Sequence, residues 1–197
     1  ATGGIVSITT RGASKDWFGG LEYLTSGFKS GEKVIGLDSY GYNLLGFNLA
    51  GPILTRKDSA GNKTDAIAGF FISGELKSEV DQRPSAIGNF KVNNEKMDEL
   101  NKTPYAVRLD EVGGVLNNAS FVKSEDLQQV KFRQNVGYKG LNLAGKIDIS
   151  PTKNMTVTLG GTFDYNDSKA YVRSNALFNS DNNPQLIDRS WRTYARF

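Results

Sequence analysis

Alternation of apolar and polar side chains runs through this chain and limits what it can fold into. In residues 65–77 (DAIAGFFISGELK), apolar side chains such as Phe70 and Leu76 alternate with polar ones such as Glu75 and Lys77. Successive side chains of a β-strand point to opposite faces, so this pattern predicts a strand with one apolar and one polar face. Helical periodicity is nearly absent, and the chain is therefore predicted to be all-β.

The same pattern predicts six strands that follow an opening one. The alternation is clear again in LNLAGKIDI (141–149) and TVTLGGTFDY (156–165). The opening strand is expected at 3–11, and the following six at 17–28, 39–53, 65–77, 141–149, 156–165 and 186–197.

The connections between these strands are of two kinds. Residues 55–64 and 150–155 are short, polar and rich in turn-forming residues. Residues 81–128 and 166–185 form longer polar connections, with a short helix expected near 94–101. Short turns at one rim and long loops at the other are typical of an outer-membrane β-barrel.

A soluble β-sandwich also shows alternating strands and is the alternative fold. Two features favour the barrel. The predicted inward faces carry small and charged residues, which suit a wet lumen. Aromatic residues gather toward strand ends, as they do at membrane interfaces: Trp17, Tyr40, Tyr42, Tyr165, Tyr171 and Trp191.

Six strands are too few to close a barrel, because the smallest bacterial barrels have about 8. The sequence therefore predicts either a section of a larger antiparallel transmembrane barrel or a sheet closed by a partner. A small complete barrel of the adhesin or OmpA-like kind is a further alternative, since Trp191 and Phe197 resemble a terminal aromatic pattern.

Composition narrows the function classes. The chain of 197 residues contains no Cys and no His, so thiol chemistry, Cys/His zinc sites and histidine acid–base catalysis are excluded for it. Its formal charge of +3 is dispersed, which argues against a nucleic-acid surface. No run of about 20 apolar residues is present. We expect no enzymatic activity, no cofactor and no resident metal.

Several stretches resemble TonB-dependent outer-membrane receptors. TGGIVSITTRGASKDWFGGLE (2–22) is similar to the junction at which the plug domain ends and the first barrel strand begins. Further likeness to the Oar-like branch of the Bacteroidota, which carries a carboxypeptidase-regulatory-like domain, lies in GYNLLGFNLAGPIL (41–54), GFFISGE (69–75), LAGKIDISPTKNMTVTLGGTFDY (143–165), LFNSDNNPQ (177–185) and RSWRTYARF (189–197).

The resemblance implies a fold and a location. Residues 1–14 would be the end of a plug domain, and 15–197 the N-terminal part of a barrel of about 22 strands in the cell outer membrane. The turns at 55–64 and 150–155 would face the periplasm, and residues 29–38, 81–128 and 166–185 the exterior.

The resemblance also implies a function and partners. It predicts uptake of a scarce or bulky solute, with energy from the TonB complex reached through an N-terminal part outside this chain. Outer-membrane lipid and a lipoprotein or other outer-membrane protein are the expected further partners. The alternative is an Oar-like barrel that serves as a structural or assembly component without transport.

The candidate site residues are those that the alternation places on the lumen side, as contacts for a plug or for solute. They are Asp65, Glu75, Lys77, Lys146, Asp148, Arg192 and Arg196. A polar wall that only tolerates water and internal ion pairs is the competing interpretation. If a hard cation binds in the polar loops, its ligands are expected among Asp164, Asp167 and Asp181.

Overall fold

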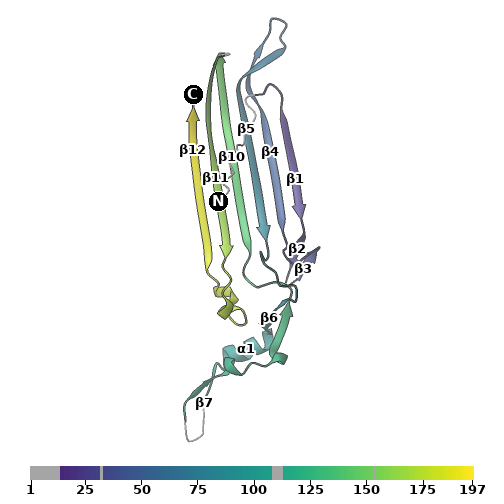
Figure 1. Ribbon diagram of the computed structural model, residues 1–197, viewed down its shortest axis with the longest axis vertical. Helices are drawn as coiled ribbons and strands as arrows, with labels where there is room; N and C mark the ends of the chain where they lie inside the picture. The colour runs from purple at the N-terminus through teal and green to yellow at the C-terminus, as the bar shows by residue number, and fades with distance from the viewer. Residues whose placement is uncertain (1–13, 32, 108–112, 153) are drawn as a thin grey trace, which may run out of the picture.

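The computed structural model describes residues 14–31, 33–107, 113–152 and 154–197. Its main element is one six-stranded antiparallel sheet in the order β1-β4-β5-β10-β11-β12 (Figure 1). These strands are β1 (Phe18–Thr25), β4 (Asn43–Lys57), β5 (Lys63–Glu79), β10 (Tyr138–Thr152), β11 (Met155–Lys169) and β12 (Gln185–Arg196). The six predicted strands and the all-β class are confirmed. The strand expected at 3–11 lies outside the described residues.

Most of these strands are longer than the alternating sequence stretches that predicted them. β4, β10 and β11 have 15 residues each and β5 has 17, against a usual length of about 5–6. The turn between β4 and β5 is therefore shorter than the predicted 55–64, because backbone pairing continues to Lys57 and Lys63. The second turn is shorter for the same reason, since Thr152 pairs with Met155.

One irregularity interrupts the pairing of β4 with β5. The register shifts between Pro52 and Lys57, after Pro52 has paired with Gly69. Proline has no backbone N–H to donate to a neighbouring strand, so a bulge next to Pro52 accommodates it within the sheet.

At the long-loop end, the strand expected over 17–28 divides in two at Ser26. The Ser26 hydroxyl donates to the Asp38 carboxylate at 2.8 Å and accepts from the Tyr42 amide at 3.1 Å. The chain then forms the hairpin of β2 (Gly27–Ser30) and β3 (Lys33–Gly36). A side chain at Gly36 would lie 2.2 Å from the Ser26 carbonyl oxygen, so this close approach requires glycine.

The segment between β5 and β10, expected to be largely irregular, contains several short elements. They are β6 (Asn89–Val92), α1 (Asn94–Lys102), β7 (Tyr105–Val107), β8 (Val115–Asn117), β9 (Leu127–Val130) and the 3₁₀ turns Asn118–Phe121 and Ser124–Asp126. α1 confirms the helix expected near 94–101. Asn93 caps it, because its side chain accepts a hydrogen bond from the Lys96 amide at 2.8 Å. Two more 3₁₀ turns, Arg173–Asn175 and Ser180–Asn182, lie between β11 and β12.

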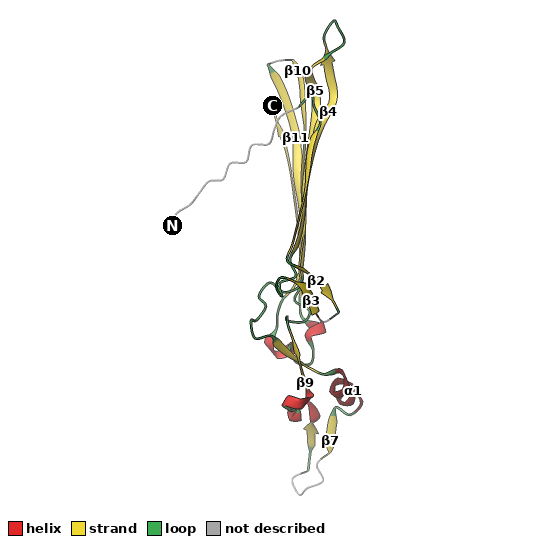
Figure 2. Cartoon of the chain, turned by 90° about the vertical axis from the view of Figure 1, so that its right-hand side faces the viewer, coloured by secondary structure: helices red, strands yellow, loops and turns green. Residues whose placement is uncertain are grey.

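The sheet is a single layer. Seen edge-on in Figure 2, it forms a thin blade, and the loops gather at one end without covering either of its faces. Most buried apolar residues lie in these loops (Val34, Val92, Leu100, Val130, Phe132 and Val136), whereas Ala50 is the buried apolar side chain of the described sheet. Among the described residues, no helix is long and apolar enough to cross a membrane.

Candidate functional site: the polar face of the sheet

Strand register divides the sheet into two chemically different faces. Leu45 pairs with Leu76, which pairs with Leu141, and Leu141 pairs with Tyr165. We call the side that carries this row the apolar face. It also carries Leu21, Phe47, Leu49, Phe70, Ile72, Leu143, Ile147, Ile149, Leu159, Phe163 and Trp191. We call the opposite side the polar face.

The apolar face is exposed. Leu21 is 76% accessible and Trp191 73%, although both lie well inside long strands. Trp17 packs on this face against Phe70, with the ring centroids 5.4 Å apart, and covers Gly51, where a Cβ would lie 2.6 Å from the indole ring. The expectation that Trp191 lies toward a strand end is wrong, because β12 runs from Gln185 to Arg196 and places it midway.

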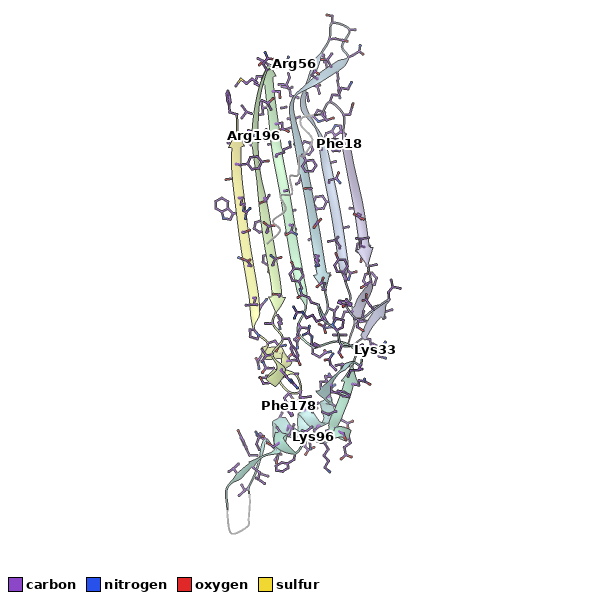
Figure 3. All side chains as sticks on the ribbon, in the orientation of Figure 1. Phe18, Lys33, Arg56, Lys96, Phe178 and Arg196 are labelled. Carbon is purple, nitrogen blue, oxygen red and sulfur yellow. The ribbon has the colours of Figure 1, made fainter. Side chains whose placement is uncertain are left out.

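All seven candidate residues from the sequence lie on the polar face. Asp65, Glu75 and Lys77 are spaced by even numbers along β5. Lys146 and Asp148 pair with Phe71 and Gly69 of that face. Arg192 and Arg196 follow from β12, where they pair with Thr162 and Thr158 (Figure 3 labels Arg196).

Lys146 and Asp148 form a buried polar cluster with Thr158. The Lys146 ammonium lies 3.0 Å from Asp148 Oδ2, and the Thr158 hydroxyl donates to Asp148 Oδ1 at 2.6 Å. Asp148 is only 4% exposed. Its charge is therefore compensated within the sheet rather than by solvent. Thr158 was absent from the sequence-based set because its contact with Asp148 depends on register between strands.

Lys77 lies in a second cluster, near the long-loop end of the polar face. Its ammonium group is 2.8 Å from Glu79 and 5.2 and 5.4 Å from the ring centroids of Tyr42 and Tyr138. The Tyr138 hydroxyl in turn donates to the Asn166 side chain at 2.5 Å. Two aromatic rings thus hold this cation in place beside its carboxylate partner.

Between these clusters the polar face is hollowed. The hollow has a volume of about 840 Å³ and receives side chains from β1 to β12, including Glu22, Glu75, Asn142, Asp164 and Arg192. Glu22 was missed as a candidate and Asp164 was considered only as a cation ligand, although their register positions place both in one row with Glu75 and Asn142. Asp65 lies outside this hollow, toward the β4–β5 turn.

The residues considered for a hard cation are not brought together. Asp164 and Asp167 differ by an odd number along β11 and so lie on opposite faces, where they accept hydrogen bonds from Ser190 and Gln185 respectively. Asp181 accepts instead from Asn135 at 2.6 Å, in the loops. The described part of the chain contains no group of three or more acidic residues placed to hold a metal ion.

Beyond the sheet, an ion pair ties the long loops together. Asp81 is fully buried, and its carboxylate accepts from the Arg133 side chain at 2.6 and 3.0 Å and from the backbone amides of Arg83 and Arg133. The Arg133 guanidinium also stacks over Tyr171, 4.8 Å from the ring centroid. This pair thereby links the loop after β5 to the loop after β11.

No protein-family model matches this chain, and no curated protein or solved structure matches it either. The sheet offers an apolar surface on one side and a solvated surface of ion pairs, amides and hydroxyls on the other. Such a pair of surfaces can separate an apolar medium from water.

Proposed function

We propose that this chain forms part of the wall of a transmembrane β-barrel in the outer membrane, within a TonB-dependent receptor that takes up a solute. The observation that carries the proposal is the single-layer antiparallel sheet, with one continuous apolar face and one charged face and no described element covering either (Figure 2). In water, an apolar surface of this extent would normally be buried.

The height of the apolar face suits a membrane. From Ala66 to Leu76, the apolar side of β5 extends about 33 Å along the strand, at ~3.3 Å per residue. With a strand tilt of ~40°, this length corresponds to a band about 25 Å tall, as in outer-membrane barrels. The polar face would then line a water-filled lumen, and Lys146 and Asp148 would be part of that wall as a pair whose charges compensate each other.

The unpaired edge of the sheet at β12 supports the proposal that the barrel is larger than these six strands. Within the described chain, β12 pairs only with β11, and all twelve of its residues are exposed. In lipid, the free N–H and C=O groups of such an edge would each cost several kcal/mol. We therefore propose that further strands continue the sheet beside β12; the resemblance to TonB-dependent receptors implies a barrel of about 22 strands. The long loops would face the exterior and cover bound solute.

Cysteine accessibility tests the lipid–lumen assignment. The chain has no natural cysteine, so single substitutions report on one position each. Neighbouring residues form matched pairs, Asn142→Cys with Leu143→Cys and Thr162→Cys with Phe163→Cys, since each pair samples both faces at one height. In native outer membranes, a water-soluble maleimide should label positions 142 and 162 and leave 143 and 163 unlabelled. Equal labelling within each pair would overturn the assignment.

Two further measurements test the receptor. An antibody against residues 81–128 should detect, in outer-membrane extracts, a polypeptide several-fold heavier than the 21.5 kDa of this chain. Deletion of a TonB-box in that polypeptide should abolish its physiological role. A role that survives this deletion would instead favour the structural or assembly function.

A further inference from the structure

A recess of about 630 Å³ lies where the apolar face meets the long loops. Lys139, Asp167 and Lys169 line it from the sheet, and Lys29 and Phe132 line it from the loop end. Lys139 pairs with Asp167 and precedes Leu141 by two positions on β10. Its side chain therefore belongs to the apolar face, in the first row beyond the Leu45–Leu76–Leu141–Tyr165 row.

Positive charge predominates in this recess. Lys29, Lys139 and Lys169 form no ion pair within the described residues; Lys29 instead lies 5.5 Å from the centre of the buried Phe132 ring. Asp167 is the carboxylate opposite Lys139 in the register, and it accepts a hydrogen bond from Gln185 at 2.8 Å; the described residues show no ion pair between Asp167 and a lysine. The remaining acid and base of the recess, Glu79 and Arg133, are neutralised by partners outside the recess, Lys77 and Asp81.

The position of these lysines matters as much as their charge. Lys139 and Lys169 are diagonal neighbours on the apolar face, because Lys139 opposes Asp167 and Lys169 follows by two positions. Lysine stems can lie along apolar surface while the ammonium group reaches polar surroundings. One row nearer to the apolar band, Arg189 lies over the Tyr165 ring, 5.4 Å from its centroid. Positively charged side chains thus border the apolar side chains of this face at the long-loop end.

We propose that this recess binds the phosphorylated headgroup of a membrane lipid, whose acyl chains lie on the apolar face. This inference rests on the proposed membrane location. The occupant is a lipid rather than a free phosphate because the cationic recess continues directly into the apolar band, and Phe28, at 55% exposure, adds an apolar wall. A headgroup phosphate would be held by Lys139 and Lys169, with Lys29 approaching from the loops.

Native mass spectrometry of the full-length protein in detergent tests this site. Phosphatidylglycerol is the probe, and phosphatidylcholine with the same acyl chains is the comparison lipid, because it carries no net charge. The double variant Lys139→Gln/Lys169→Gln should bind phosphatidylglycerol about 30-fold more weakly than the native protein. The matched control is Lys57→Gln/Lys63→Gln, which removes two exposed lysines from the hairpin at the opposite rim and should bind normally.

Any other outcome would contradict the proposal. Equal loss in both double variants, or no loss in either, would overturn the proposed recess. Displacement of the lipid by inorganic phosphate at equimolar concentration would make it a site for free anions and also overturn the proposal. If neither lipid binds any form of a protein that is otherwise folded, the membrane location itself fails. Heat-dependent mobility on denaturing gels checks the folding of each variant independently.

Discussion

Asp81 and Arg133 lie 52 residues apart in the sequence, and the Arg133 Nη2 group donates to Asp81 Oδ1 at 2.6 Å in a pair whose carboxylate is fully buried. The carboxylate also accepts hydrogen bonds from two backbone amides. Such a group is stable only while its partners remain, because removing the cation leaves a buried charge. The arrangement of the long loops therefore depends on this contact.

Replacement of Arg133 by alanine should loosen the loops. Loss of one partner of a buried pair costs about 3–5 kcal/mol. Hydrogen exchange should accordingly accelerate in residues 80–107 and 170–184, while β10 and β11 keep their protection. Lys123→Ala is the control, because its partner Glu125 lies 3.6 Å away and both side chains are about three-quarters exposed. Unchanged exchange in the Arg133 variant would show that other contacts hold the loops.

The buried Lys146–Asp148 pair on the polar face predicts that removing its cation costs more stability than removing an exposed cation of the same face. Lys146→Met should destabilise the protein by about 3 kcal/mol, since Asp148 would keep only its Thr158 hydrogen bond. Arg192→Met removes an exposed cation from the same face and should change stability by less than about 0.5 kcal/mol. Urea unfolding in lipid vesicles measures both. The additional substitution Asp148→Asn should recover part of the loss in the Lys146 variant, and failure to recover would point to lost packing of the lysine stem.

Two glycines of β4 should differ in whether they tolerate replacement by alanine. In Gly51→Ala, the new Cβ would lie 2.6 Å from the Trp17 ring and push it off Phe70, at a cost of about 1–3 kcal/mol. Gly46→Ala meets nothing within 4 Å and serves as the matched control. In a Trp191→Phe background, fluorescence reports on Trp17 alone. Its emission should shift with Gly51→Ala and stay constant with Gly46→Ala; the same emission in both would disprove the packing.

The β4–β5 turn should respond to acid. Asp58 accepts hydrogen bonds from the amides of Ala60 and Asn62 at 2.9 and 2.8 Å, and these bonds lower the pKa of its carboxyl below the ordinary value of 3.8, with Asn62 the largest cause. A lowered pKa stabilises the folded turn above pH 3.8, and this contribution disappears as the pH falls through the lowered value. Amide exchange at Ala60 and Asn62, corrected for intrinsic rates, should lose protection there. In Asp58→Asn this pH dependence should be absent.

Much of the sheet was predictable because its information is local. The alternation of Phe70 with Glu75 and Lys77 specifies both a strand and its two faces, since the side-chain period of a strand is two. The helix expected near 94–101 was similarly accessible, and the structure shows that Asn93 caps it. The predicted positions of the strand ends were less accurate. Near Lys57 and Lys63 both faces are polar, so the alternation ends while backbone pairing continues.

The remaining features depend on contacts between distant segments. That Lys146 and Asp148 share a face follows from their spacing, but the third member, Thr158, follows only from the register of β10 with β11. The sequence likewise offered no reason to join Asp81 to Arg133, which form their ion pair across 52 residues. Lys139 and Lys169 were not singled out by the sequence, and only the register of β10 with β11 makes them diagonal neighbours on the apolar face.

By itself, therefore, the sequence determined the strand class, the number of long strands, the two chemically distinct faces and the separation of short turns from long loops. These properties come from side-chain period and turn chemistry, which act over a few residues. Only the tertiary structure decided which side chains meet: the Asp81–Arg133 pair, the Asp148 cluster and the cationic recess. Such meetings are set by strand register and loop closure, which bring together residues that no local pattern relates.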